Sequence, residues 1–230
     1  MMVKASAAIV PIRSEARHAS EQVSQLLKGE YAEVLETHGD WLLVSCLHDQ
    51  YQGYVIGRQM EEVTEVLQPS RYQTALIEQS TSGLTYFGTP IYSVSNTHSN
   101  LLLSCEEMIA CSALLEGVPY QWGGRTSAGI DCSGLVQVLF RMAGISLPRD
   151  AKDQAVLGET LSLIQEAKPG DLAFFDNEHG KITHVGLIVG EGLIRHASHW
   201  VRTDRIDSYG IFTDRWGYTH SLRILKRFFK

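Results

Sequence analysis

The order of secondary-structure signals along the chain constrains the fold more than any other feature. Short apolar or alternating runs broken by glycine turns fill residues 1–66 and predict strands. Helix signals begin only at Ser104, and strand-like runs return after Pro169-Gly170-Asp171. Helices followed by an antiparallel sheet are typical of an α+β domain. The sequence therefore predicts a small all-β barrel followed, over residues 104–230, by an α+β domain.

Five runs in the first segment have the length and composition of short strands. They cover residues 7–12, 23–27, 31–35, 41–47 and 54–56. Such closely spaced strands predict a small barrel. Residues 67–103 carry a weaker pattern, which includes Pro69, Pro90 and a polar stretch from Ser93 to Asn100. They are predicted to form connecting β-hairpins or a structured linker, with a stunted second barrel as the alternative.

Two helices are predicted in the third segment. The first begins at Ser104 and runs to Gly117, because a serine followed three residues later by Glu107 is a capping-box pattern. The second spans residues 132–143 and stops at Gly144. The antiparallel sheet is predicted from apolar runs at residues 172–175, 184–189, 193–197 and 222–228.

Composition bounds the class of protein. With 44% hydrophobic and 20% charged residues, the 230-residue chain is long enough for one large or two small domains. A formal charge of −6 argues against a general nucleic-acid binder. No apolar run approaches the roughly 20 residues of a membrane span. The apolar start from Ala5 to Val10 is too short for a signal peptide, so we expect a cytoplasmic protein if the chain is complete, and a periplasmic or secreted one if a signal was removed.

Cys132 is the strongest candidate for a chemical role. It lies in Gly129-Ile130-Asp131-Cys132-Ser133-Gly134 and opens the second predicted helix. The unpaired N–H groups and the dipole at a helix N-terminus favour the thiolate, which is the nucleophilic form. The other cysteines show no C-x-x-C spacing and are predicted to be small buried apolar residues: Cys46, Cys105 and Cys111.

Two histidines, His184 and His196, lie on what is predicted as one β-hairpin. If the turn between them comprises the three residues 190–192, both histidines face the same side of the sheet. A two-residue turn would reverse this parity, so the preference for His196 over His199 depends on the turn. Together with Cys132 this pair predicts a thiol acyl-transfer enzyme, in which His184 is the general base and acid and His196 orients its ring. The remaining histidines are predicted to be solvated: His18, His38, His48, His98, His179 and His220.

A set of motifs then matches a known family. They are Tyr120-Gln121-Trp122-Gly123-Gly124, Asp131-Cys132-Ser133-Gly134, Leu147-Pro148-Arg149-Asp150, Lys168-Pro169-Gly170-Asp171-Leu172 and His184-Val185-Gly186. In this order they resemble the NlpC-type cell-wall peptidases, bacterial cysteine enzymes with a reduced papain-like fold. The stretch before them, with Gly39-Asp40-Trp41 and Tyr51-Gln52-Gly53-Tyr54-Val55, is similar to the bacterial SH3-like domain that often precedes such enzymes. The resemblance implies a papain-like catalytic domain, with helices packed on an antiparallel sheet, after an SH3-like barrel.

The resemblance is closest to the γ-D-glutamyl-L-diamino acid endopeptidases, which cleave murein peptides that carry a free N-terminal L-alanine. In that subgroup Cys132, His184 and His196 would be the catalytic triad. The implied substrate-binding residues are Tyr120, Trp122, Asp131, Ser133, Asp150, Glu15 and Tyr51. Among these, the carboxylates of Asp131 and Asp150, with an SH3-like acid taken to be Glu15, would hold the alanine ammonium.

This resemblance implies a hydrolase of cell-wall peptide recycling. Its partner would be the peptide L-Ala-γ-D-Glu-diamino acid, with neither nucleic acid nor membrane as a partner, and it would need no metal and no organic cofactor. The alternatives are an N-acetylmuramoyl-L-alanine-type amidase, a general peptidoglycan hydrolase and a wall-binding module without activity. Individual residues have alternatives too: Asp131 as a helix N-cap, Asp150 as the partner of Arg149 or the cap of the next helix, and Trp122 as core packing.

Overall fold

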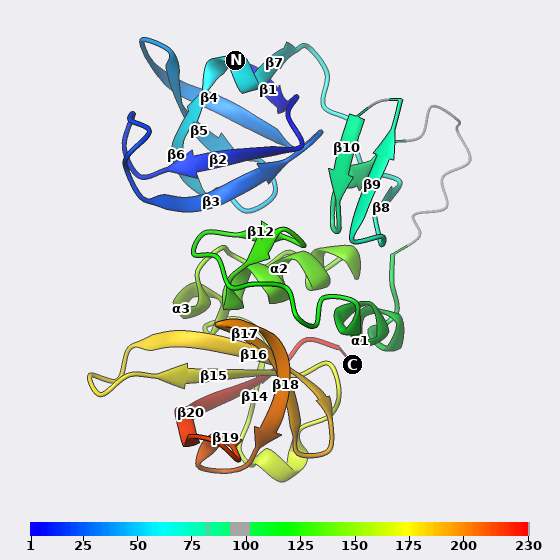
Figure 1. Cartoon of the computed structure of the whole chain (residues 1–230), viewed down its shortest axis with the longest axis vertical. Helices are drawn as coiled ribbons and strands as arrows, with labels where there is room; N and C mark the ends of the chain where they lie inside the picture. Colours follow the sequence, from blue (N-terminus) through cyan, green and yellow to red (C-terminus); the bar gives the residue numbers. More distant parts are fainter. Residues whose placement is uncertain (82, 93–101, 230) are drawn as a thin grey trace. The chain divides into compact units, whose positions relative to one another are not determined.

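The structure is a computed structural model, which describes residues 1–81, 83–92 and 102–229 (Figure 1). It divides into two compact units. The first comprises Met1–Leu102 with Gln121–Ala128, and the second comprises Leu103–Tyr120 with Gly129–Lys230. The sequence-based division at residues 66 and 103 remains a prediction about domains. The compact units differ from it in one respect, because residues 121–128, which the sequence placed in the third segment, belong to the first unit.

The first unit is built around one seven-stranded antiparallel sheet, in the order β3-β2-β6-β5-β4-β1-β7. Its strands are β1 (Met2–Ala5), β2 (Ile9–Arg13), β3 (Gln22–Leu27), β4 (Tyr31–His38), β5 (Trp41–Cys46), β6 (Gln52–Ile56) and β7 (Met60–Val63). The five predicted runs correspond to β2 through β6. The sequence reading missed β1 and β7, which have four residues each and pair with each other. One face buries an apolar core that includes Val3, Val10, Ile12, Leu26, Val44 and Val55.

Two small ladders follow this sheet in the first unit. They pair β9 (Ile77–Ser80) with β10 (Gly83–Tyr86), and β8 (Arg71–Tyr72) with β11 (Pro90–Ile91). Phe87, in the connection between them, is fully buried. A further short strand, β12 (Arg125–Thr126), belongs to the inserted segment. The polar stretch from Ser93 to Asn100, on which part of the linker prediction rested, lies outside the described residues.

The sheet of the second unit has the order β14-β20-β15-β16-β17-β18-β19, and a further ladder between β19 and β20 closes it. Its strands are β14 (Glu159–Leu161), β15 (Leu172–Asp176), β16 (Ile182–Gly190), β17 (Leu193–Ser198), β18 (Trp200–Ile206), β19 (Gly210–Thr213) and β20 (Gly217–Arg227); β13 (Gly129–Ile130) lies apart from it. The apolar core of this sheet comprises Ala173, Phe175, Ile188, Ile194, Ile206, Ile211 and Leu225. Sequence reading found β15, β16, β17 and β20. It missed β14 and β19, which are only three and four residues long, and β18, which carries several polar residues.

The second unit has three α-helices among its described residues, α1 (Cys105–Ala113), α2 (Cys132–Met142) and α3 (Ala151–Gln154), and a 3-10 helix at Ile164–Glu166. The predicted capping box is confirmed, since the Glu107 N–H donates to Ser104 Oγ at 3.2 Å and the Ser104 N–H donates to the Glu107 carboxylate at 2.8 Å. Helix α1 ends at Ala113, before the predicted Gly117. Helix α2 is almost wholly buried and packs against β16 and β17 (Figure 1). Because strands far outnumber helices, the predicted α+β character is confirmed only in part.

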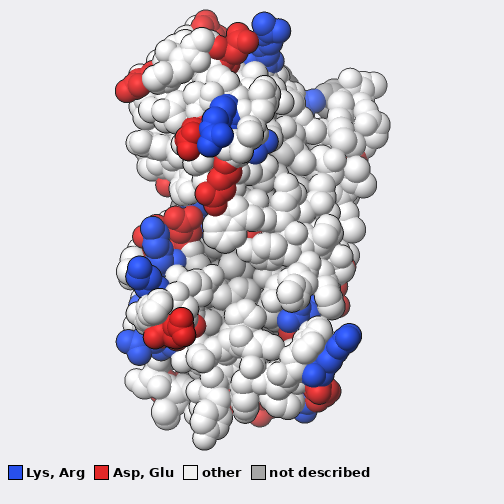
Figure 2. All heavy atoms as spheres, turned by 60° about the vertical axis from the view of Figure 1, so that its left-hand side comes forward, with Lys and Arg blue, Asp and Glu red and all other residues white. Residues whose placement is uncertain are grey.

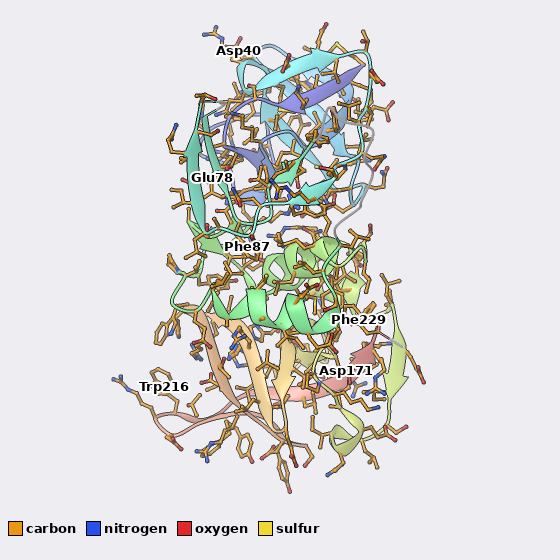
Figure 3. All side chains as sticks on the ribbon, turned by 90° about the vertical axis from the view of Figure 1, so that its right-hand side faces the viewer. Asp40, Glu78, Phe87, Asp171, Trp216 and Phe229 are labelled. Atoms are coloured by element: carbon orange, nitrogen blue, oxygen red, sulfur yellow. The ribbon has the colours of Figure 1, made fainter. Side chains whose placement is uncertain are left out.

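The Lys168-Pro169-Gly170-Asp171 motif forms the turn that leads into β15. The Asp171 carboxylate accepts the Lys168 N–H at 2.7 Å and pairs with Arg227 near the end of β20, also at 2.7 Å. Figure 3 labels Asp171 and Phe229 in this region. Gly170 has a φ of +98°, and a Cβ there would lie 2.3 Å from the sulfur of Cys105. The motif therefore serves the fold, because it joins α1, β15 and the last strand.

The turn between β16 and β17 differs from the prediction, yet the predicted parity holds. Strand β16 ends at Gly190 and β17 begins at Leu193, so the turn has two residues. The ladder, however, shifts register between Ile188 and Gly190, which adds one residue to β16. This bulge restores the alternation that a three-residue turn would have produced, so His184 and His196 share the sheet face of Ile188 and Ile194.

Charges of both signs are interspersed over the face drawn in Figure 2. This mixture agrees with the overall balance of 20 basic and 26 acidic residues. Among the described residues, no helix combines the length and the apolar character that a membrane span requires.

Candidate active site

Cys132 is the first residue of α2, and its side chain is only 6% exposed. The backbone N–H groups of Val185 and Ser133 both donate to the thiol sulfur. Because Val185 directly follows His184 on β16, the nucleophile helix meets the sheet at the strand that carries the predicted base. The fold thus brings Cys132 to the strand of His184 although 51 intervening residues separate them in sequence.

The expectation that the helix N-terminus makes Cys132 a thiolate is corrected. Burial raises the pKa of the thiol to about 12, and the negative charge of Asp131 adds to this effect. The two N–H donors and Arg149 act in the opposite direction but do not compensate. In the free protein burial therefore favours the neutral form of the Cys132 thiol, so its reaction as a nucleophile would need a base to accept its proton.

His184 and His196 form a buried, hydrogen-bonded pair. Nε2 of His184 lies 2.8 Å from Nδ1 of His196, and the two ring planes are nearly perpendicular, at 85°. The next residue in the chain of contacts is Asp204 on β18, whose Oδ2 lies 2.9 Å from His196 Nε2. Burial lowers the pKa of both histidines, that of His184 well below its ordinary value. Both imidazoles are consequently neutral near pH 7.

The glycine of the His184-Val185-Gly186 motif makes room for this pair. A Cβ on Gly186 would lie 2.6 Å from a methyl carbon of Ile194 and 3.0 Å from the Cβ of His196. A larger residue would therefore require the side chains of Ile194 and His196 to shift. The motif therefore combines the predicted base with the space that its partner requires.

Sequence reading missed three neighbours of this pair, Asp204, Arg202 and His220. Asp204 accepts from Arg202 Nε at 2.7 Å in addition to His196. His220 stacks on His184 with ring centroids 4.2 Å apart and 28° between the planes, so the expectation of a solvated His220 is wrong. The ladder between β18 and β17 sets His196 opposite Arg202, and alternation then puts Asp204 on the same face. Extending the hairpin register by one strand would have found Asp204, whereas His220 depends on the β19–β20 closure.

A second polar cluster surrounds the start of α2. The Asp131 carboxylate accepts the Gly134 N–H at 2.7 Å, as predicted for an N-cap, and also pairs with the Arg149 guanidinium. Arg149 Nη1 donates to Ser133 Oγ at 2.8 Å and to Asp131 Oδ1 at 3.1 Å. All three side chains are buried. The partner of Arg149 is therefore Asp131, and not Asp150 as the alternative reading held.

Tyr120 and Asp150 belong to the electrostatic environment of this cluster. Burial raises the pKa of the Tyr120 hydroxyl well above its usual range, and the negative charge of Asp131 adds to this effect. Asp150 occupies the N-cap position of α3, as one alternative held, but its side chain makes no cap hydrogen bond. Its carboxylate is half-buried, which raises its pKa, and its Oδ2 lies 3.8 Å from Lys152 Nζ.

Two family models match this chain. Residues 117–219 match the NlpC/P60 family, and residues 12–58 match the bacterial dipeptidyl-peptidase Sh3 domain. The chain contains an NlpC/P60 domain preceded by a bacterial SH3-like domain. The NlpC/P60 match includes Cys132, His184, His196 and Asp204, whereas His220 lies one residue beyond its end.

Curated relatives match less than half of this chain. The γ-D-glutamyl-L-lysine dipeptidyl-peptidase of Bacillus subtilis (strain 168) is 46% identical over 96 residues, which are 41% of this chain and 32% of that protein. The γ-DL-glutamyl hydrolase of the same organism is 43% identical over 103 residues, which are 44% of this chain and 24% of that protein. The chain thus covers about a third or less of the length of these relatives.

A solved structure shares the fold over nearly the whole chain. It is an NlpC/P60 family protein from Bacillus cereus ATCC 10987, with a TM-score of 0.80. The alignment covers 99% of both chains at 17% identity. At that identity the likeness concerns the fold alone, and it includes the NlpC/P60 fold together with the SH3-like unit.

The remaining predicted site residues lie in the unit that contains the SH3-like domain. Trp122 is 60% exposed, so the reading of Trp122 as core packing is wrong, and its carbonyl accepts from the Gln22 amide at 3.1 Å. Glu15 is exposed and pairs with Arg17 at 2.7 Å. The Tyr51 N–H donates to Asp49 Oδ1 at 3.0 Å. A substrate-binding role for Trp122, Glu15 and Tyr51 stays a prediction.

Arg125 anchors the segment that carries Trp122 within the first unit. Its side chain is fully buried and its guanidinium contacts both carboxylate oxygens of Glu30, at 2.8 and 3.2 Å. Its backbone N–H donates to the Gln25 side chain at 2.8 Å. Gly123 has a φ of +73°, and a Cβ there would lie 2.5 Å from the Gln22 carbonyl oxygen. Gly123 therefore allows the segment to approach β3 closely.

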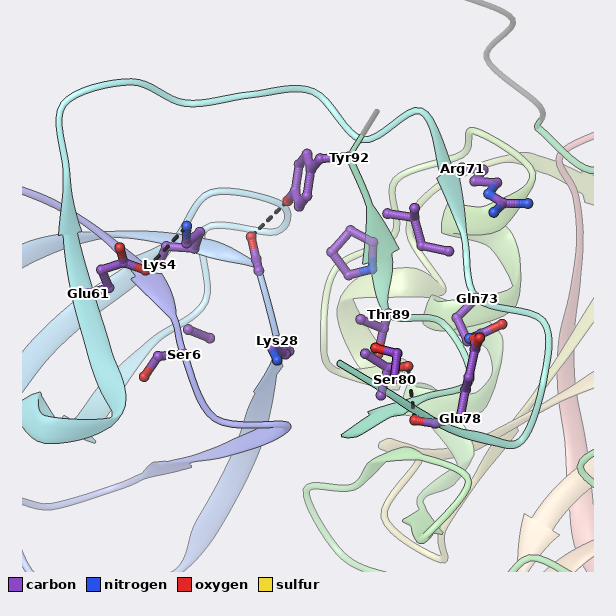
Figure 4. Close-up of a pocket in the computed structure, with 15 residues that line it drawn as sticks. Lys4, Ser6, Lys28, Glu61, Arg71, Gln73, Glu78, Ser80, Thr89 and Tyr92 are labelled. Carbon is purple, nitrogen blue, oxygen red and sulfur yellow. Dashed lines mark hydrogen bonds and ion pairs between the residues drawn. The ribbon is translucent and has the colours of Figure 1, made fainter. Parts of the chain in front are cut away.

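A cavity of about 520 Å³ also lies in the first unit, between β1 and the two small ladders (Figure 4). Charged side chains of both signs line it, among them Lys4, Lys28, Arg71, Glu61 and Glu78. Lys4 pairs with Glu61 at 3.3 Å, and Glu78 contacts the Gln73 amide. None of the predicted site residues lines this cavity.

Proposed function

We propose that this chain is a cysteine peptidase that hydrolyses the γ-D-glutamyl–diamino acid bond of murein peptides with a free N-terminal L-alanine. The observation that carries the proposal is the contact between the buried Cys132 and the strand of His184, whose ring is hydrogen-bonded to His196. Membership of the NlpC/P60 domain in a family of cysteine peptidases supports the same chemistry. The name of one relative, γ-D-glutamyl-L-lysine dipeptidyl-peptidase, supports the proposed choice of the cleaved bond.

The arrangement supports a papain-like mechanism, in which a nucleophile helix packs on an antiparallel sheet that carries the base. His184 takes the proton of Cys132 as the sulfur attacks the γ-carbonyl carbon of D-glutamate. The resulting oxyanion is held by the Cys132 backbone N–H, at the start of α2, and by the Tyr120 hydroxyl. His184 then gives the proton to the departing amine of the diamino acid. A thioester between Cys132 and the γ-carbonyl remains.

Hydrolysis of the thioester completes the reaction. His184 accepts a proton from water as the hydroxide attacks the thioester carbonyl, and it returns that proton to the sulfur of Cys132. The products are L-Ala-D-Glu and the free diamino acid or its remainder. Because the thiol has a raised pKa and the imidazole a lowered one, the proton moves only as negative charge develops on the carbonyl oxygen. This coupling limits reaction with other electrophiles.

The preference for a free N-terminus rests on carboxylates. Asp150 is the strongest candidate, because its carboxylate is half-buried, makes no cap hydrogen bond to α3 and has a raised pKa that a bound ammonium would lower again. Asp131 and Glu15 are proposed to contribute charge. An acylated peptide carries no ammonium and would leave these carboxylates without their partner, which costs several kcal/mol for buried charges. Such an enzyme would act on released peptides, so we propose a role in cytoplasmic recycling.

The test compares L-Ala-γ-D-Glu-diaminopimelate with its N-acetylated form, with Cys132→Ala as the control. Cleavage of the free peptide alone, lost in the variant, is the expected result. Equal cleavage of both peptides would contradict the carboxylate pocket and indicate a general peptidoglycan hydrolase. Cleavage of neither, with release of peptide from N-acetylmuramoyl-L-alanine substrates, would indicate the amidase.

A further inference from the structure

The pair His184–His196 continues to a carboxylate that no part of the proposed mechanism uses. We propose that Asp204 is a positioning residue that selects the tautomers of both histidines and thereby leaves Nδ1 of His184 as the proton acceptor for Cys132. This inference rests on the proposed function, because it concerns the same thiol site. It adds a fourth residue to the three that sequence reasoning assigned.

The hydrogen-bond chain determines where each proton lies. A carboxylate only accepts, so His196 Nε2, at 2.9 Å from Asp204 Oδ2, carries a proton. A neutral His196 then has a bare Nδ1, which accepts the proton on His184 Nε2 at 2.8 Å. A neutral His184 with its proton on Nε2 has a bare Nδ1. The carboxylate at one end of the chain thus prepares the base at the other end.

Asp204 is itself held in place from several sides. Arg202 Nε donates to the same oxygen, Oδ2, at 2.7 Å. The Arg202 guanidinium also donates to the Ser198 carbonyl and lies over the Trp200 ring, 5.2 Å from its centroid. Asp204 remains ionised, because the hydrogen bonds from His196 and Arg202 lower its pKa although burial opposes this. The carboxylate is therefore fixed in both position and charge.

The charges around His184 determine how easily it accepts a proton. Asp204 favours a positive charge on the histidine pair, whereas Arg202 disfavours it. His220 stacks on His184, but burial lowers the pKa of His220 to about 4, so it is uncharged near neutral pH. His199 is a further neighbour of His220 and acts in the same direction as Arg202. Removal of Asp204 therefore leaves Arg202 as the main charged neighbour.

Asp204 could instead serve only to stabilise β18. The substitutions Asp204→Asn and Asp204→Ala distinguish that structural role from the proposed positioning role. Because both donors meet one oxygen, the amide oxygen of Asp204→Asn accepts from both and keeps the tautomers while the charge is lost. Asp204→Ala loses the acceptor as well. We expect kcat to fall about tenfold in Asp204→Asn and about a hundredfold in Asp204→Ala, with KM within twofold of the wild type.

The pH dependence of kcat/KM also distinguishes the two roles, because loss of a purely structural contact would not shift it. In both variants the acid limb of kcat/KM shifts to lower pH, because the carboxylate no longer raises the pKa of the histidine pair. In Arg202→Gln the limb shifts to higher pH, because a cation that lowers that pKa is gone. Asp214→Asn is the matched control, an exposed carboxylate of the same unit that pairs with Arg205, and it should leave the profile unchanged. An unmoved limb in Asp204→Ala would overturn the proposal.

A direct measurement of the tautomers covers the case in which Asp204→Ala fails to fold. In ¹⁵N-histidine-labelled Cys132→Ala, NMR should find the proton of both His184 and His196 on Nε2. A proton on Nδ1 of His184 would overturn the proposal without any assay of activity. The kinetic controls keep the two hypotheses apart: full activity in Cys132→Ala refutes the thiol site, whereas an inactive Cys132→Ala together with wild-type kinetics in Asp204→Ala refutes only the role of Asp204.

Discussion

Each unit of the molecule contains a buried arginine–carboxylate pair, and the two pairs have different surroundings. In the first unit Arg125 pairs with Glu30, and neither side chain is exposed to solvent. In the second unit Arg149 pairs with Asp131, and their side chains are 2% and 7% exposed. Both pairs connect segments that are distant in sequence. The second pair also acts electrostatically on the thiol of Cys132, the proposed nucleophile.

The difference shows that burial of an ion pair does not by itself indicate a functional site. Two buried charges gain little net stability, but removal of one leaves the other uncompensated. In the first unit, the free-energy cost of separating Arg125 from Glu30 keeps residues 121–128 packed against the strands of that unit. Around Arg149 the same chemistry also sets the charge next to a thiol, because Asp131 opposes the thiolate and Arg149 favours it. Function is indicated by the neighbours of the pair.

The largest expected effect is on the stability of the first unit. Glu30→Ala leaves the fully buried Arg125 without its main anion, which should cost about 3–5 kcal/mol of unfolding free energy. Urea unfolding followed by circular dichroism measures this, with Glu33→Ala, at an exposed position of β4, as the control. The double variant Arg125→Met/Glu30→Leu should recover much of the loss. Equal midpoints for Glu30→Ala and Glu33→Ala would remove the basis of the comparison.

The next largest effect is on the reactivity of Cys132, which should respond to the Arg149–Asp131 pair and not to the Arg125–Glu30 pair. Asp131→Asn keeps an oxygen for the Gly134 N–H but removes a negative charge that raises the pKa of Cys132. The thiol pKa should fall, so alkylation of Cys132 by iodoacetamide at pH 8 should become several-fold faster, while peptide hydrolysis decreases. Mass spectrometry of the Cys132 peptide measures the rate. Glu30→Gln is the control and should leave that rate unchanged. An equal acceleration in Glu30→Gln would mean that both variants expose Cys132 by general destabilisation of the fold.

A smaller effect concerns acid stability of the first unit. The pKa of Asp49 is lowered to about 2: burial opposes ionisation, but His48, at 3.2 Å, and Arg125 outweigh it. A carboxyl whose folded pKa is depressed contributes stability above its unfolded value near 4 and loses it as pH falls toward 2. We expect a loss of about 2 kcal/mol across this window, absent in Asp49→Asn. Unfolding measured at pH 5, 4, 3 and 2 tests this, and parallel curves for both proteins would contradict it.

The smallest effect is expected at an exposed pair. Glu15 and Arg17 are both well exposed, and such pairs contribute little to stability. Glu15→Gln should leave the unfolding midpoint unchanged. If Glu15 contributes to the ammonium pocket, KM for the free-amine tripeptide should rise about threefold, whereas Glu36→Gln, at another exposed acid, should not change it. Identical KM values for both variants would remove Glu15 from the site.

Local patterns predicted the parts of the site that depend on neighbouring residues in sequence. The capping box at Ser104, the N-cap Asp131 and the start of α2 at Cys132 follow from hydrogen bonds within one turn of helix. The shared face of His184 and His196 was predicted as well, although through a three-residue turn. The structure reaches the same parity with a two-residue turn and a bulge, which alternation alone does not distinguish.

The residues that sequence reasoning missed depend on contacts between distant segments. Burial of Cys132 against β16 reverses the expected ionisation, because desolvation outweighs a helix terminus. His220 reaches His184 only through the closure of the sheet by β19 and β20. The sequence by itself determined the local elements, namely the start of α2 at Cys132 with its N-cap Asp131 and the shared sheet face of His184 and His196. The tertiary structure decided their protonation and their partners, because burial and charge pairing arise only when separate strands and helices pack together.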